Sequence, residues 1–179
     1  MLSIMEKSAH PKLTSSPQPT GPVTVPPDAP AGDAESQFDQ GVKFASGRGA
    51  ARDYAQAAAC YRKAADQSHP LAQFNLGIMF AEGHGMAPDA AESLVWFGRS
   101  ARLGDAGAQF KLGDNCYRAS LWQTPPDAAE SRIEAYKWYR LAAAQGYEGS
   151  EASFASLSMK MTWEDVAAGN SRVDAFGKG

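Results

Sequence analysis

The sequence lacks several features that mark out common classes of protein. No apolar run approaches the roughly 20 residues that cross a bilayer. The first ten residues carry only Leu2, Ile4 and Met5 as strongly apolar side chains, which is not the pattern of a secretory signal. The formal net charge is −3, without the basic excess that nucleic-acid binders usually show. We therefore expect no membrane span, no nucleic-acid partner and a cytoplasmic location.

Cysteine and histidine are also scarce. Cys60 and Cys116 are the two cysteines, and they lie far apart in the chain, so we expect two buried, reduced thiols, in keeping with a reducing compartment. The histidines, His10, His69 and His84, have no cysteine or carboxylate at metal-ligand spacing. No nucleophile–base pattern or phosphate-binding glycine loop stands out. We expect no catalytic residue, no metal site and no cofactor, and we assign the histidines no role.

What the chain does contain begins with a proline-rich stretch. Most of the 11 prolines lie between Pro11 and Pro30, where there is no aromatic residue. Proline removes backbone donors and blocks helices, and a stretch so poor in apolar side chains cannot offset the entropy of folding. Residues 1–34 are therefore predicted to form an extended, disordered tail. Two P-x-x-P spacings could dock in an aromatic-lined groove, but a solvated linker is the simpler interpretation.

A six-residue motif repeats with a period of 36 residues. AQFNLG at 72–77 returns as AQFKLG at 108–113, and a degenerate copy, SQFDQG, stands at 36–41. A fixed period in this range is the signature of a solenoid, and the apolar residues within each copy have helical spacing. The pattern predicts three helix-pair repeats followed by a capping helix pair, at 35–69, 71–105, 106–148 and 149–176.

Three glycines occupy the same phase of the repeat inside predicted helices: Gly41, Gly77 and Gly113. Glycine in a helix interior costs about 1 kcal/mol relative to alanine. We expect that the second helix of each pair passes too close for a side chain, with its own small alanine and serine residues facing the glycine. Aromatic residues of the second helices would fill the space between pairs: Tyr61, Phe97 and Tyr139.

Capping residues predict where helices begin. Asp53, Asp89 and Asp127 each precede a helical pattern, and the glutamine or glutamate three residues after the first two completes a capping box. Thr162 is the predicted cap of the last helix, which Gly169-Asn170 is expected to kink or split.

The repeated residues resemble the Sel-one-like repeats, relatives of the tetratricopeptide repeat. The second repeat carries the family pattern most completely: Ala72, Leu76-Gly77, Phe80, Gly83, Gly85, Asp89, Trp96-Phe97, Ser100-Ala101 and Gly104. The third repeat lacks the Gly-x-Gly turn and has Cys116 at the aromatic position, and the first has Gln40 for leucine and Cys60 for tryptophan. The resemblance covers about residues 35–176. It implies an all-α, right-handed α/α solenoid that binds other proteins and is not an enzyme.

The resemblance also implies where a partner binds. In the tetratricopeptide fold the first helix of each pair lines the concave face, which would place one phenylalanine of each repeat in an exposed groove. The same phenylalanines could instead pack in the core, and both interpretations stay open. The predicted partner-binding residues are Phe38, Val42, Phe74, Ile78, Glu82, Phe110, Asp114, Tyr117 and Arg118. The partner is expected to be a protein or peptide of unknown identity, bound by a monomeric chain.

The third repeat departs from the period and supplies an alternative. PDAAES at 88–93 returns at 126–131, and the Trp-Phe pair at 96–97 returns as Trp-Tyr at 138–139. Two residues are therefore inserted in the loop and four in the helix after it. The loop should place Leu121 and Trp122 at or near the surface, where they could dock the chain into a larger assembly. A remote alternative is a relative that binds or hydrolyses β-lactams, but such relatives carry a cysteine pair in every repeat.

Overall fold

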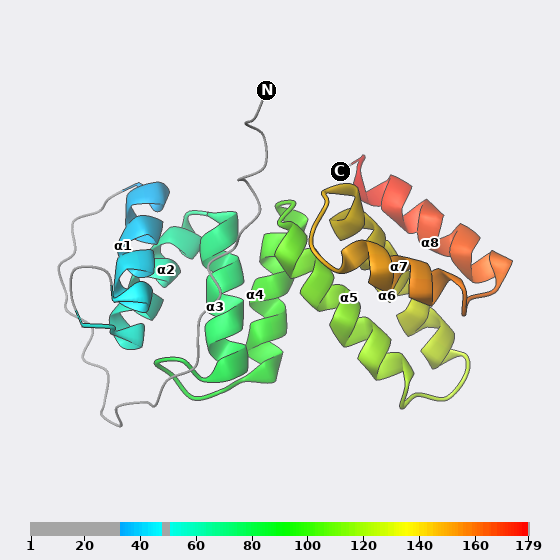
Figure 1. Cartoon of the computed structure of the whole chain (residues 1–179), viewed down its shortest axis with the longest axis horizontal. Helices are drawn as coiled ribbons and strands as arrows, with labels where there is room; N and C mark the ends of the chain where they lie inside the picture. Colours follow the sequence, from blue (N-terminus) through cyan, green and yellow to red (C-terminus); the bar gives the residue numbers. More distant parts are fainter. Residues whose placement is uncertain (1–32, 48–50, 179) are drawn as a thin grey trace. The chain divides into compact units, whose positions relative to one another are not determined.

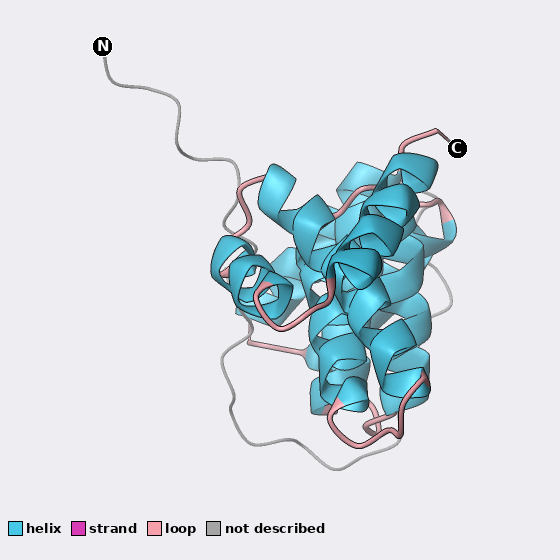
Figure 2. Ribbon diagram, turned by 90° about the vertical axis from the view of Figure 1, so that its right-hand side faces the viewer, coloured by secondary structure: helices cyan, strands magenta, loops and turns pink. Residues whose placement is uncertain are grey.

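The computed structural model describes residues 33–47 and 51–178, and within these ranges the chain forms α-helices joined by loops, without a β-strand (Figures 1 and 2). The proline-rich tail and residues 48–50 lie outside the described residues. The helices are α1 (Ala34–Ser46), α2 (Tyr54–Asp66), α3 (Pro70–Glu82), α4 (Ala90–Arg102), α5 (Ala106–Ser120), α6 (Asp127–Ala144), α7 (Ser150–Ser158) and α8 (Trp163–Phe176).

The helices fall into two compact units: α1 to α4 lie in unit 1, which ends at Leu103, and α5 to α8 lie in unit 2, which begins at Gly104. In unit 1, α1 pairs with α2 and α3 pairs with α4, and α2 also packs against α3. In unit 2, α5 pairs with α6, while α7 and α8 both pack against α6 (Figure 1). The helix pairs α1–α2, α3–α4 and α5–α6 thus correspond to the three repeats, whereas α7 and α8 each pack on α6.

Helix starts are fixed by N-caps, as predicted for Asp53, Asp89 and Thr162. The predicted capping boxes are wrong in one respect. The backbone N–H groups of Asp53 and Asp89 donate to the carbonyls of Phe44 and Phe80, at 3.0 and 2.8 Å. These N–H groups therefore tie the second helix of a pair to the end of the first. They have no need of the side chain three residues on.

The third predicted cap is also corrected. Asp127 is the first residue of α6, and Pro126, whose side chain has no acceptor, holds the cap position. In the identical PDAAES segment of the second repeat, α4 begins one position later, and Asp89 is its cap. The carboxylate of Asp127 still lies in the first turn, where the helix dipole favours negative charge.

The helical glycines accommodate aromatic rings, which differs from the predicted contact with small side chains. A Cβ built on Gly41 would lie 2.5 Å from two carbons of Tyr61. The corresponding distances are 2.6 Å from Gly77 to Phe97 and 2.7 Å from Gly113 to Tyr139. In each repeat the ring of the second helix lies directly on the glycine of the first: Gly41 with Tyr61, Gly77 with Phe97, and Gly113 with Tyr139.

The same contact joins the last helix to unit 2. Gly169 lies in the middle of α8, which runs without a break from Trp163 to Phe176, so the helix is not split there. The ring of Tyr136 on α6 occupies the space that a Gly169 side chain would need. The Tyr136 hydroxyl also donates to Oδ1 of Asn170 at 2.8 Å. Gly169 is therefore a docking point of α8 on α6.

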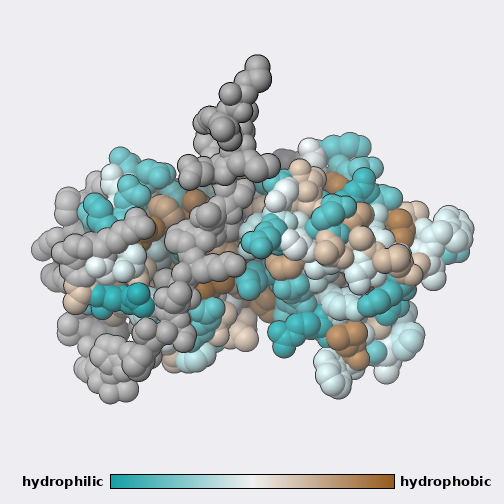
Figure 3. Space-filling view, viewed as in Figure 1, coloured by the Kyte–Doolittle hydropathy of each residue, from teal (hydrophilic) through white to brown (hydrophobic). Residues whose placement is uncertain are grey.

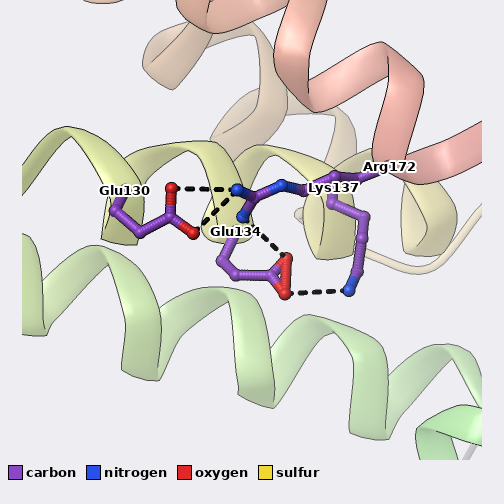
Figure 4. A network of polar contacts seen from close by, with 4 residues as sticks. All are labelled: Glu130, Glu134, Lys137 and Arg172. Carbon is purple, nitrogen blue, oxygen red and sulfur yellow. Dashed lines mark hydrogen bonds and ion pairs between the residues drawn. The ribbon is translucent and has the colours of Figure 1, made fainter.

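Charged side chains add to this attachment. Arg172 of α8 donates to both carboxylate oxygens of Glu130 on α6, at 2.7 and 2.9 Å (Figure 4). Its second terminal nitrogen lies 3.7 Å from Glu134, which also pairs with Lys137 at 3.0 Å. The network spans one face of α6 and orients α8 along it.

Two histidines have structural roles that the sequence did not reveal. His69 caps α3 by accepting the N–H of Ala72 at 3.2 Å, and its ring stacks on Phe38 with centroids 4.6 Å apart. The buried His84 stacks on Tyr54 at the same centroid distance. Both rings pack a loop or a helix start of one repeat against the neighbouring repeat of unit 1.

Candidate functional site

The phenylalanine of each first helix, which was the centre of the predicted groove, contacts the aromatic ring of its own helix pair. Phe38 lies 5.7 Å from Tyr61 between ring centroids, and Phe74 lies 5.7 Å from Phe97. Phe38 is 8% exposed and Phe74 is 5% exposed. In unit 1 these two rings are therefore part of the packed core, and little of either could touch a partner.

In unit 2 the equivalent ring, Phe110, is half-buried. It lies between two tyrosines, with its centroid 5.6 Å from Tyr139 and 5.4 Å from Tyr147. It also packs against the cluster that contains Leu157 of α7. Phe110 thus keeps some exposed surface, although most of its contacts are within the chain.

The remaining predicted groove residues of unit 1 are more accessible. Val42 is half-buried against the core, and Ile78 is also half-buried. Glu82 is exposed, and one of its oxygens lies 3.2 Å from Nδ1 of His84. The accessible first-helix surface of unit 1 is thus one aliphatic side chain on each helix, together with a carboxylate on α3.

Two of the three remaining predicted residues of unit 2 are already engaged in contacts within the chain. Asp114 accepts a hydrogen bond from the Tyr139 hydroxyl at 2.8 Å. Tyr117 accepts one from Lys160 at 3.1 Å, and the Lys160 ammonium also lies over its ring. Arg118 is exposed. Of these three, only Arg118 presents its charged group freely to solvent.

The loop between α5 and α6 presents the most exposed aromatic side chain among the described residues. Leu121 is 59% exposed and Trp122 is 90% exposed. On the face of unit 2 shown in Figure 3, hydrophobic residues form only small, separate areas among hydrophilic ones. The loop thus exposes two adjacent large apolar side chains.

The sequence analysis missed two further exposed apolar residues and one set of buried polar ones. Met159 and Trp163, which flank the turn between α7 and α8, are 82% and 77% exposed. The buried set is the glutamine of each opening motif: Gln37, Gln73 and Gln109. Gln73, for example, donates to the Ala65 carbonyl at 3.0 Å and so joins α3 to the end of α2. The recurrence of glutamine at one phase of the repeat was the available signal.

Two thiols and two phenols inside the protein are held in their neutral forms. Burial raises the pKa of the Cys60 and Cys116 thiols, which are both free. Burial also raises the pKa of Tyr61, and for Tyr139 the hydrogen bond to Asp114 adds to the same effect. Protonated thiols and phenols are poor nucleophiles. In the part of the chain that the structure describes, no cluster of His, Cys, Asp and Glu could hold a metal ion.

These contacts place the molecule in the class of all-α helical-repeat proteins with a solenoid fold. Each repeat is an antiparallel helix pair in which an aromatic ring of the second helix packs on a glycine of the first. This contact recurs in all three repeats. The chain belongs to the Sel1 repeat family, whose model matches residues 34–69, 70–105 and 106–147. The predicted family and fold class are thus confirmed.

A solved structure agrees with this assignment. A Sel1 repeat protein from Oxalobacter formigenes is 29% identical, with a TM-score of 0.60, over 68% of this chain and 47% of that one. A protective antigen with an SLR fold from uropathogenic Escherichia coli strains is also 29% identical, with a TM-score of 0.47, over 69% of this chain and 33% of that one. The chain thus covers less than half the length of either protein. The search of curated proteins found no match.

The family assignment bears on function at a coarse level. Sel1 repeat proteins are generally non-catalytic scaffolds for protein–protein interaction. No helix among the described residues is long and apolar enough to cross a membrane.

Proposed function

We propose that this chain is a non-enzymatic adaptor that binds another protein through the α5–α6 loop. The general role of the family supports partner binding. We choose this loop because Leu121 and Trp122 are exposed on it, at the place where the third repeat departs from the other two.

The physical argument concerns what each aromatic residue contacts. The repeated rings of the second helices fill the helical glycines, and the buried first-helix rings pack against them, so both sets stabilise the fold. Trp122 is 90% exposed and therefore makes few contacts in the free chain. A tryptophan buries roughly 150–250 Å² when it is covered, and tryptophan is enriched among the residues that dominate binding energy. Leu121 extends the same apolar surface, so a partner with an apolar pocket fits this loop.

The first-helix surface of unit 1 is the second candidate. It is supported by the half-buried side chain of Ile78 and the exposed side chain of Glu82. These residues would give a partner one apolar contact and one negative charge. The burial of Phe38 and Phe74 leaves this surface with less apolar area than the sequence suggested.

The test is affinity capture of the tagged chain with crosslinking and mass spectrometry, comparing variants that alter one surface each. The loop variant combines Leu121→Ser with Trp122→Ser, and the first-helix variant combines Ile78→Ser with Glu82→Gln. Trp163→Ser is the matched control, because it removes an equally large exposed ring from unit 2. Partners recovered with wild type and Trp163→Ser, but lost with the loop variant, are the expected result.

Two results would contradict the proposal. Loss of partners with the first-helix variant and their retention with the loop variant would assign binding to the first-helix surface of unit 1. No partner for the wild-type chain under any condition would argue against an adaptor. Circular dichroism of each variant checks that it is folded, which we expect because all the substituted loop side chains are exposed.

A further inference from the structure

Two arginines in unit 1 converge on one buried tryptophan. The guanidinium carbon of Arg99 lies 4.5 Å from the centroid of the Trp96 ring, and that of Arg62 lies 5.9 Å from it. Arg62 belongs to α2, whereas the other two residues belong to α4, so the cluster bridges two repeats. Arg62 also lies 5.8 Å from the ring of Phe80 on α3. Trp96 itself is 3% exposed and is therefore a fixed platform for both cations.

Both arginines are exposed, and among the described residues neither forms an ion pair with a carboxylate. On the same helices, the nearest acidic residues are Asp66, one helical turn beyond Arg62, and Glu92, two turns before Arg99. Neither pairs with them. Both cations thus lie within 6 Å of the centroid of one ring, and neither is paired with a carboxylate among the described residues.

Stacking on an aromatic ring occupies the face of a guanidinium and leaves its in-plane N–H groups free. Those N–H groups form the planar fork that matches a carboxylate with two parallel hydrogen bonds. A stacked arginine has also already lost much of the freedom that it would lose on binding. The cluster therefore has the properties of a prepared anion-binding surface.

We propose that Arg62 and Arg99, supported by the ring of Trp96, bind a carboxylate-rich segment of a partner protein. This inference rests on the proposed function in assuming a protein partner, and it adds the chemistry of one contact. The two guanidinium groups are exposed on the surface. An extended acidic segment with at least two carboxylates therefore fits them better than a small anion.

A purely structural role for the arginines is the competing explanation. Cations near a helix C-terminus interact favourably with the helix dipole, and Arg99 lies in the last turn of α4. Arg102 lies in the same turn, is exposed, and stacks on no ring among the described residues. It is therefore a matched control that removes one charge from α4 without touching the platform.

The test is a titration of the full chain with a ten-residue peptide of alternating Glu and Ser, followed by fluorescence anisotropy of a neutral dye on the peptide. Low ionic strength, about 50 mM salt, keeps screening small. The expected result is binding by the wild-type chain and a rise in Kd of about tenfold or more for Arg62→Gln with Arg99→Gln. Arg102→Gln should change Kd by less than about twofold. A Gln-Ser peptide should not bind.

A second variant keeps the test informative if the glutamine pair does not fold. Arg62→Lys with Arg99→Lys keeps both charges and the alkyl stems but removes the planar fork, so Kd should still rise by about threefold or more. If the lysine variant binds as tightly as the wild type, the planar guanidinium groups have no specific role in binding. Equal losses of affinity for Arg102→Gln and for the Arg62/Arg99 glutamine pair would show that binding depends only on the net charge of the chain.

A third arm and the capture experiment separate the remaining outcomes. A phosphoserine peptide that binds while the glutamate peptide does not would refute the assignment to carboxylates. Failure of the glutamate peptide to bind wild type overturns this inference but leaves the capture results for the Leu121 and Trp122 variants unaffected. Failure of the capture experiment, with intact peptide binding, would instead count against the proposed function.

Discussion

The contact between a helical glycine and an aromatic ring can be tested by making one substitution at two glycines. Gly77 and Gly98 both lie inside helices of unit 1. A Cβ on Gly77 would lie 2.6 Å from two carbons of Phe97, whereas a Cβ on Gly98 would meet only the mobile end of Arg102, at 3.7 Å. Replacement by alanine therefore changes the same helix propensity at both positions but adds a clash only at Gly77.

The magnitudes follow from these two terms. Alanine is favoured over glycine in a helix interior by about 1 kcal/mol, so Gly98→Ala should stabilise the chain by up to about that amount. Gly77→Ala gains the same term but overpacks the contact, which typically costs about 1–3 kcal/mol. The free energy of unfolding should thus be lower in Gly77→Ala than in Gly98→Ala by about 1–3 kcal/mol.

Urea unfolding followed by circular dichroism measures this difference, and thermal unfolding checks its sign. For a chain of this size, 1 kcal/mol corresponds to a shift of roughly 2–4 °C in Tm. In a Phe97→Leu background the ring atoms that meet the new methyl group are gone, so Gly77→Ala should be less destabilising there. If Gly77→Ala stabilises the wild-type chain as much as Gly98→Ala does, the ring does not require the glycine and the reasoning fails.

Three further predictions concern the helix contacts. Burial and the hydrogen bond from its hydroxyl raise the pKa of Tyr139. Its neutral form therefore stabilises the fold below the ordinary tyrosine pKa of about 10, and this stabilisation is lost as pH rises above it. Tyr139→Phe should reduce the loss of stability between pH 9 and 11, measured by urea unfolding. Asp89→Ala should cost about 1 kcal/mol because it removes an N-cap, whereas Asp127→Ala should cost clearly less; equal costs would contradict the cap assignment. Arg172→Gln should speed amide hydrogen exchange in α8 while leaving α5 unchanged, because it breaks the bidentate contact with Glu130; unchanged exchange in α8 would show that the ion pair is dispensable.

The features predicted correctly from the sequence depend on local chemistry. The repeat period, the helix pairs and the caps at Asp53, Asp89 and Thr162 all follow from residues close together in the chain. A cap needs only a suitable side chain just before a helical pattern. The period needs only that equivalent residues recur at a constant offset.

The features predicted wrongly depend on which side chain of one helix contacts a given residue of another helix. Gly77 was correctly identified as a site of close approach, but the approaching group is the ring of Phe97 and not a small side chain. The sequence shows that both residues recur, and it does not show that they meet. Gly169 was mistaken for a break because its partner, Tyr136, lies 33 positions earlier on another helix.

The candidate site shows the same limit. Phe74 recurs at one phase of the repeat and fits both a groove and a core, because periodicity fixes the face of a helix and not what covers it. The structure buries it against the second helix. Trp122 was easier to place, since a departure from the period at a loop indicates a surface position. The paired arginines on Trp96 could not be foreseen, because one of them comes from the preceding repeat.

Site-specific photocrosslinking in cells tests most directly whether the chain binds a protein through the α5–α6 loop. A photoreactive phenylalanine analogue replaces Trp122 in one variant and Trp163 in another. We expect a specific partner to crosslink at position 122 and the same partner to crosslink much less efficiently at position 163. Crosslinking of the same partner with equal efficiency from both positions, or from position 163 alone, would contradict it.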